Sequence, residues 1–197
     1  MIAAISAHIA LCAFAVAVAA AVAVPAALAL ADRPSVERPL SALLGALYTI
    51  PSLALLAVLV QFVGLGNASV EIALVAYALY AIFRSTVAGV RAIPAEQREV
   101  ATALGLPSWK RRLRVELPLA IPAILSGLRI ATLGSIALAT LGGYVGGSGL
   151  GAILFTGFAL QNRAMLVQGA LGVVAIALLA ELAFRALERS ARRRASA

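Results

Sequence analysis

The sequence predicts an all-α membrane protein with about five transmembrane helices. Hydrophobic residues make up 63% of the 197 positions and charged residues only 12%, which is too apolar for the surface of a soluble domain. Uncharged stretches at 1–31, 40–70 and 130–162 provide the roughly 20 apolar residues that each bilayer crossing requires. No long soluble domain fits between these stretches, so we expect residues 1–197 to form a single transmembrane domain.

Spans are predicted at about 4–30, 41–63, 70–90, 117–141 and 164–186. The first lacks a basic residue before its apolar core, so a retained span is expected rather than a cleaved signal peptide. Basic residues gather after the first span, between the third and fourth spans, and beyond the fifth, whereas the other two connections contain only Arg163. By the positive-inside rule, this distribution places the C-terminus in the cytoplasm and the N-terminus outside.

Two residues inside the predicted spans are candidates for a pathway. Pro51 removes a backbone hydrogen bond near the middle of the second span, so a kink or unwound segment is expected there. Such a break often lines a pathway, and a tolerated kink without substrate contact is an equal alternative. Arg129 lies deep in the fourth span, where a charge is costly in lipid, so an interior structural or gating role is favoured over snorkelling. The candidate pathway residues are Thr49, Pro51, Ser52 and Arg129, while Glu71 and Glu181 are expected to mark span ends.

Several kinds of function are disfavoured by the residues present. The net charge of +8 comes from basic residues between apolar stretches, so no nucleic-acid partner is expected. Cys12 and His8 have no companion ligands, and the sequence contains no Ser, His and acid constellation, so neither a metal site nor an enzyme is expected. No G-x-x-x-x-G-K-[ST] motif occurs, so we expect no nucleotide on this chain. The glycine-rich run at 147–151 is expected to form an external loop, a gate or a plain turn.

The one long polar segment, at 91–116, has the features of two short helices. Pro94 suits a first helical position, Gly105 can end the first helix, and Pro107 can start the second. Basic residues in the second half are favourable near the C-terminal end of the helix dipole. Trp109 begins an apolar pair at i, i+4 spacing. A helical hairpin with an apolar stripe needs a partner surface, so we expect this segment to dock against another protein.

The same segment resembles the cytoplasmic motif of ATP-binding-cassette (ABC) importer permeases, which reads EAA, three residues, G, and later LP. The matching residues, with valine in place of the usual alanine at 100, are Glu99, Val100, Ala101, Gly105, Leu117 and Pro118. The resemblance implies a coupling helix that seats in a groove of separate ATPase subunits, which would bind the ATP and Mg that this chain does not. The implied coupling residues are Glu99, Ala101, Gly105, Leu106, Pro107, Trp109, Arg112, Glu116 and Pro118.

Further stretches are similar to permeases of the glycine betaine, carnitine and choline uptake family. They read YTIPSLALLAVLVQFVGLGNAS at 48–69, AYALYAIFRSTVAGV at 76–90, VELPLAIPAILSGLRIATLGSIALAT at 115–140 and GGYVGGSGLG at 142–151. Tyr48 stands where many relatives have glutamine. The resemblance implies the type I ABC importer permease (MetI-like) fold in the bacterial inner membrane. It also implies a second permease chain, identical or related, and an extracytoplasmic binding protein that delivers the osmoprotectant.

Two alternatives to osmoprotectant import remain open. An ABC permease of the same kind could carry another small solute, such as an amino acid or an anion. An ATP-independent channel or membrane scaffold would explain the basic segment as positive-inside charge, although not its proline and glycine pattern. Aromatic residues are only 6% of the chain and no aromatic cage is apparent, so recognition of a quaternary ammonium is expected mainly in the binding protein.

Overall fold

Helical structure follows from the apolar composition, because in lipid each backbone N–H and C=O must be satisfied by hydrogen bonds within the protein. The computed structural model describes residues 1–103 and 106–195, and these contain helices and connections but no strand. The elements in chain order are α1 (Ile2–Leu30), α2 (Pro34–Thr49), α3 (Ser52–Val63), α4 (Asn67–Arg91), α5 (Ala95–Ala103), α6 (Ser108–Arg111), η1 (Arg112–Glu116), α7 (Leu117–Gly142), η2 (Gly143–Val145), α8 (Leu150–Ala159) and α9 (Arg163–Ala195).

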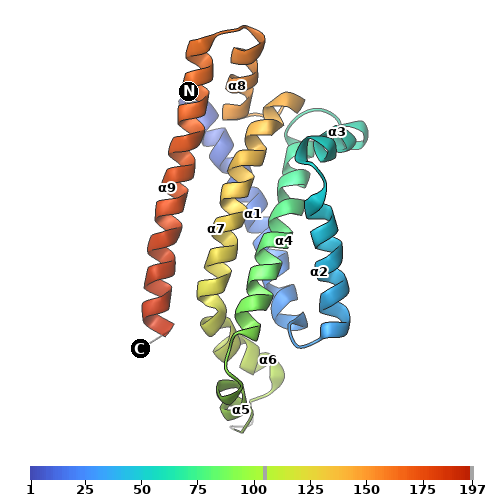
Figure 1. The fold of residues 1–197 in the computed structure, drawn as a ribbon, viewed down its shortest axis with the longest axis vertical. Coiled ribbons are helices and arrows are strands. Elements are labelled where there is room, and N and C mark those ends of the chain that lie inside the picture. The colour runs from blue at the N-terminus through green and yellow to red at the C-terminus, as the bar shows by residue number, and fades with distance from the viewer. Residues whose placement is uncertain (104–105, 196–197) are drawn as a thin grey trace.

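Among the described residues, four segments are long and apolar enough to cross a membrane: α1, α4, α9 and the stretch Ser108–Val145, which is built on α7. The pair α2 and α3 is bent by 93° at residues 50–51 and makes a fifth crossing if counted as one span. The prediction of about five transmembrane helices is therefore confirmed, as is the break at Pro51. The two chain ends lie near opposite ends of the bundle (Figure 1).

The centre of the bundle is α4, which packs against both α1 and α7. Its side chains Leu74, Ile82 and Phe83 are almost completely buried. On α1, small side chains at every fourth residue allow the two backbones to approach closely. These buried residues are Ala15, Ala19, Ala23 and Ala27. The alanine-rich first span is therefore a packing surface for α4.

The contact between α4 and α7 depends on two glycines. A Cβ on Gly89 would lie 2.4 Å from the Cβ of Ala123, and a Cβ on Gly127 would lie 2.7 Å from the Cβ of Ser85. Both distances are far below van der Waals contact, so a larger residue would push the helices apart. These glycines set how closely α7 lies against α4.

The glycine-rich run at 147–151 forms the turn from η2 into the start of α8, and residues 146–149 of this turn are not helical. Here η2 and α8 follow α7, and α8 packs beside the start of α9 (Figure 1). A Cβ on Gly143 would lie 2.2 Å from the carbonyl carbon of Gly151, and a Cβ on Gly151 would lie 2.2 Å from the Thr140 carbonyl oxygen. The glycines are needed because two backbone segments cross here almost in contact.

The C-terminal part of the chain contains more helix than the predicted spans. The last helix, α9, runs to Ala195, well beyond the predicted end at 186. The segment assigned to the connection before it contains α8, an apolar helix of 10 residues that is too short to cross the bilayer. Only 6% of the most apolar stretch of α9 is buried, so most of its apolar surface is left for lipid or another chain.

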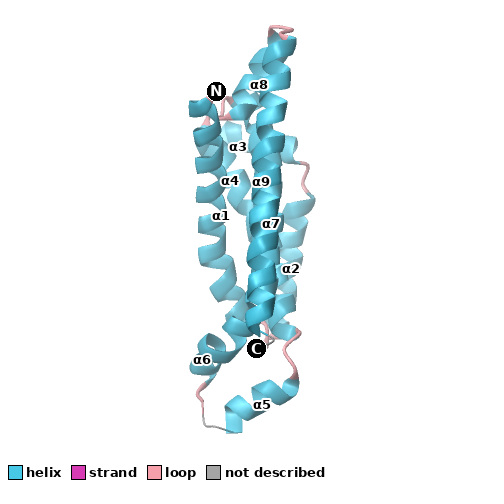
Figure 2. Ribbon diagram, turned by 90° about the vertical axis from the view of Figure 1, so that its left-hand side faces the viewer, coloured by secondary structure: helices cyan, strands magenta, loops and turns pink. Residues whose placement is uncertain are grey.

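The short helices α5 and α6 lie beyond the long helices, at the end of the bundle opposite the N-terminus (Figures 1 and 2). From α6 the chain passes through the π turn η1 into α7 without interruption, so Ser108–Val145 forms one helical rod of 38 residues. Single π turns inside long helices are frequent at functional sites. The rod connects the docking segment directly to the membrane-spanning part of the molecule.

Candidate coupling and translocation sites

The predicted docking segment contains two short helices, as its proline and glycine pattern indicates. The first, α5, begins at Ala95 directly after Pro94, and Pro107 precedes α6 in an extended conformation. Although α5 ends at Ala103, the glycine expected to end it, Gly105, falls outside the described residues. The prediction of two short helices within 91–116 is confirmed.

Three large apolar side chains of this helical hairpin, which we call the docking hairpin, are exposed. Val100, Trp109 and Leu113 have exposed fractions of 55%, 58% and 54%. The Lys110 ammonium lies 5.4 Å from the centre of the Trp109 ring, within the range of a cation–π contact. Large apolar side chains that gather on a segment outside the bilayer favour a contact with another protein.

The coupling residues implied by the sequence lie on two sides of the hairpin. Those that are exposed or half-buried are Glu99, Leu106, Pro107, Trp109, Arg112 and Pro118. The other two described residues, Ala101 and Glu116, are buried, with exposed fractions of 3% and 0%. The exposed group is available to a partner, whereas the buried pair contributes to the internal packing of the hairpin.

Asp32, in the turn between α1 and α2, links both short helices to the bundle. Its Oδ1 lies 3.0 Å from Nη1 of Arg98, and its Oδ2 lies 3.5 Å from Nη2 of Arg111. Arg111 Nε also lies 2.9 Å from Oε1 of Glu116, and Arg98 donates a hydrogen bond to the Val90 carbonyl. We call this ion-pair network of Asp32, Arg98, Arg111 and Glu116 the Asp32 latch. It joins the docking hairpin to α1, α2 and the start of α7.

A buried carboxylate anchors the start of the broken helix pair. The Glu37 side chain is buried, with an exposed fraction of 1%. Its Oε1 accepts a hydrogen bond from Ser41 Oγ at 2.5 Å, and its Oε2 accepts one from Arg91 Nη2 at 2.6 Å. Arg84 Nη1 lies 3.6 Å from Glu37 Oε1, and Arg91 Nε donates to the Ala31 carbonyl at 3.2 Å. Glu37 also occupies the first turn of α2, where the helix dipole favours a negative charge. The start of α2 is therefore held against α4.

Arg129 faces α9. Its Nη1 lies 3.0 Å from Oε1 of Glu181, and its Nε lies 3.0 Å from Oε1 of Glu188. Arg185 Nε lies 2.5 Å from the same Glu181 oxygen. These ion pairs compensate a charge that would be costly if it were unpaired in lipid. Glu181 lies within α9 and belongs to the link between α7 and α9.

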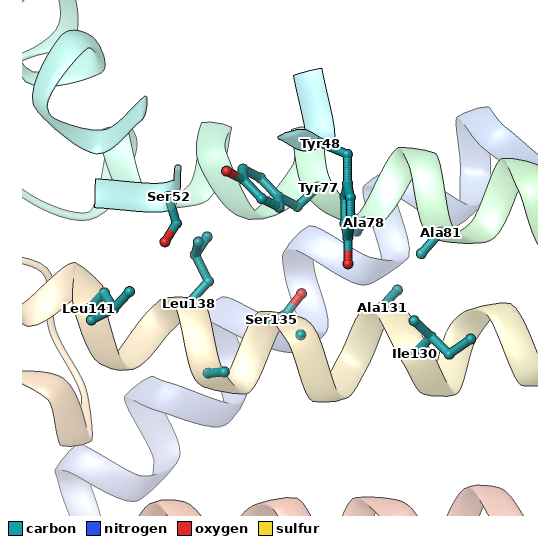
Figure 3. A pocket seen from close by; sticks show the side chains of 12 residues that line it. Tyr48, Ser52, Tyr77, Ala78, Ala81, Ile130, Ala131, Ser135, Leu138 and Leu141 are labelled. Atoms are coloured by element: carbon teal, nitrogen blue, oxygen red, sulfur yellow. The ribbon is translucent and has the colours of Figure 1, made fainter. Parts of the chain in front are cut away.

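A cavity of about 210 Å³ lies at the break between α2 and α3, against α4 and α7 (Figure 3). Ser52 and Ser135 contribute hydroxyl groups to its lining. Thr49 and Pro51 are exposed beside the break and are absent from this lining, as is Arg129. Of the four candidate pathway residues, the structure therefore brings only Ser52 to the cavity.

Three of the four tyrosines of the chain meet beside this cavity. The ring centre of Tyr48, on α2, lies 5.3 Å from that of Tyr77 and 4.9 Å from that of Tyr80, both on α4. Tyr48 and Tyr77 line the cavity, and Figure 3 shows both side chains beside it. The Tyr77 hydroxyl donates to the Ile50 carbonyl, which the break removes from the helical hydrogen-bond ladder. No aromatic cage was apparent in the sequence, and the structure brings these three tyrosines together from α2 and α4.

Asp32 and the tyrosine cluster were both missed by sequence reasoning. Tyr77 and Tyr80 are three residues apart and share a face of α4, which is a spacing signal that was available. Asp32 and Tyr48 have no such signal, because each meets partners from distant parts of the chain.

Comparison with known proteins identifies the family. The family model described as binding-protein-dependent transport system inner membrane component matches residues 3–193. The chain belongs to this permease family. A relative of the permease is the carnitine transport permease protein OpuCB of Listeria monocytogenes, which is 36% identical over 159 residues, or 81% of this chain and 73% of that protein. The glycine betaine/carnitine/choline transport system permease protein OpuCB of Bacillus subtilis is 34% identical over 141 residues, or 72% of this chain and 65% of that protein.

The fold of the permease is also that of a solved ABC importer subunit. A chain in an inward-facing structure of the MetNI methionine ABC transporter superposes with a TM-score of 0.89 at 20% identity, over 97% of this permease and 95% of that chain. The predicted type I importer permease fold is thereby confirmed. Because the family and its curated relatives are named for transport, the prediction of a transport subunit rather than an enzyme is confirmed as well.

Proposed function

We propose that this permease and a second permease chain form the membrane pathway of an ABC importer for quaternary-ammonium osmoprotectants of the glycine betaine, carnitine and choline type. The names of the two curated relatives support this class of solute. An extracytoplasmic binding protein would deliver the solute, in keeping with the description of the family as binding-protein-dependent. Separate ATPase subunits would bind ATP and Mg, and this chain would bind no cofactor.

The observation that carries the proposal is the exposure of Val100, Trp109 and Leu113 on the docking hairpin at one end of the bundle. When ATP closes the ATPase subunits, they would move this face. The movement would pass to α7 through the continuous rod and to the α1–α2 turn through the Asp32 latch. Since α2 and α7 both contribute to the cavity at the helix break, the path would open alternately to the two sides of the membrane.

We also propose that the docking hairpin and the C-terminus lie in the cytoplasm and the N-terminus outside. The hairpin and the C-terminus share one end of the bundle (Figure 1). Basic residues of the α1–α2 turn, the hairpin and the last turns of α9 gather at this end, as the positive-inside rule requires of a cytoplasmic face. An ATPase subunit can reach the hairpin only from the side that contains ATP.

Co-purification in detergent with the candidate ATPase subunit tests the coupling proposal. We expect the wild-type permease to retain the ATPase. The variants Glu99→Arg and Trp109→Asp, both on the exposed face, should reduce the retained amount by about tenfold or more, because central contacts carry most of an interface's binding energy. Arg163→Glu, an exposed charge reversal at the opposite end of the bundle, is the matched control and should leave retention unchanged.

If the wild-type permease retains no ATPase, or if the hairpin variants retain as much ATPase as the control, the basic segment only sets the topology.

Uptake of labelled choline in the presence of an excess of an unlabelled competitor identifies the solute class. We expect glycine betaine and carnitine to compete and methionine to have no effect. If only methionine competed, the solute would be assigned as an amino acid and not as an osmoprotectant.

A further inference from the structure

The tyrosine pair at the helix break has a fixed geometry. Tyr77 is held by the hydrogen bond from its hydroxyl to the Ile50 carbonyl, so its ring cannot turn freely. The Tyr48 ring packs against Tyr77 at an interplanar angle of 52° and against Tyr80 at 35°. Both Tyr48 and Tyr77 contribute to the cavity wall, so part of their aromatic surface borders an open volume (Figure 3).

The rest of the cavity wall restricts the chemistry of what it can hold. The described lining residues carry no charge, and apart from the two tyrosines only Ser52 and Ser135 add polar side chains. An inorganic cation would require several oxygen ligands, and an anion would require cationic or N–H donors. A quaternary ammonium requires neither, because its methyl groups cannot donate hydrogen bonds of ordinary strength and its charge is attracted by aromatic faces.

We propose that Tyr48 and Tyr77 bind the quaternary ammonium group of the solute as it passes the α2–α3 break. Ser52 and Ser135 offer hydroxyl groups to the polar end of the same solute, and Figure 3 shows both side chains on the cavity side of their helices. This site rests on the proposed function, and it moves part of the solute recognition from the binding protein into the permease.

The site is suited to transit rather than to storage. Tyr48 is half exposed and the cavity contains no carboxylate, so the ammonium group is attracted without a full ion pair. Conduction requires binding that is favourable enough for entry and weak enough for release. An aromatic pair without an acid meets both requirements for a cationic headgroup.

Fluorine-19 NMR of the permease tests this site directly. The permease, labelled with 3-fluorotyrosine and held with its ATPase in lipid nanodiscs, should show four tyrosine signals that single Tyr→Phe substitutions assign. Choline should shift the signals of Tyr48 and Tyr77. Tyr144, which packs against Phe155 outside the cavity, should remain unchanged as an internal control. The neutral isostere 3,3-dimethylbutan-1-ol should cause much smaller shifts, because it has the shape of choline without the charge.

Choline uptake by the complete importer is the second readout. Tyr48→Phe keeps the aromatic face and should retain uptake within about twofold, whereas Tyr48→Leu should reduce it by about threefold to thirtyfold. Tyr144→Leu, the matched substitution outside the cavity, should transport like wild type.

Three results would overturn the site: unmoved Tyr48 and Tyr77 signals, equal shifts with the neutral isostere, or undiminished uptake by Tyr48→Leu. In each of these cases, choline uptake by the wild-type importer would leave the proposed function intact. A wild-type importer that takes up none of choline, glycine betaine and carnitine would refute the proposed function, and the site together with it.

Discussion

Single charged residues connect helices that are far apart in the sequence. Asp32 reaches α5 and α6, Glu37 reaches α4, and Arg129 reaches α9. The need for a partner of Arg129 was predictable, because an unpaired charge in lipid is costly. The identity of the acid that pairs with Arg129 was not predictable. Asp32 and Glu37 carried no signal either, because acidic residues are common in turns and at helix starts for local reasons.

We expect Asp32→Asn to loosen the docking hairpin without unfolding the bundle. It weakens two partly exposed ion pairs worth about 0.2–1 kcal/mol each, so their combined loss should accelerate amide exchange in α5 by roughly twofold to thirtyfold. Exchange in the buried helix α4 should not change. The importer should still hydrolyse ATP, while the amount of choline taken up per ATP falls.

Hydrogen–deuterium exchange read by mass spectrometry, together with uptake and ATPase assays, measures these effects. Asp32→Glu retains the charge and serves as the control. Unaltered exchange in α5 of the Asp32→Asn variant would show that the Asp32 latch does not hold the hairpin.

Among the elements, apolar length was enough to locate α1, α4, α7 and α9, because hydrophobicity over about 20 residues is a local property of the chain. The break at Pro51 is local as well, since proline removes a hydrogen bond wherever it stands. The bend of 93° and the short helix α8 were not predictable, because they depend on which backbones come close to one another. The contacts between helices could therefore not be predicted from the sequence.

The contact of α4 with α7 leads to a stability prediction. Gly89→Ala places a methyl group 2.4 Å from the Cβ of Ala123, and overpacking of this kind costs about 1–3 kcal/mol. Gly134→Ala, in α7 and with no atom within 4 Å of the new Cβ, should be neutral or stabilising by up to about 1 kcal/mol. Thermal unfolding of the two purified variants in detergent compares them. Equal melting temperatures would contradict the close approach of the two helices.

For the whole molecule, the placement of the chain ends at opposite ends of the bundle followed from the odd number of spans. The sidedness rests on the distribution of basic residues and is open to direct measurement. In a Cys12→Ala background, Arg163→Cys should react with a membrane-impermeant maleimide in right-side-out vesicles. Ser108→Cys should react only after the membrane is opened. The reverse labelling pattern would place the docking hairpin outside and remove its access to an ATPase.

The unbroken helix Ser108–Val145 has a mechanical consequence for the cavity. Trp109 and Ser135 lie on this one continuous helix, and the π turn η1 and Pro122, two features that favour bending, lie between them. The opposite wall, formed by α2 and α3, is interrupted at residues 50–51 and does not turn as one body. The cavity thus has one wall that is continuous with the docking end and one that is not, so a movement at the docking end changes its width instead of carrying the whole cavity along.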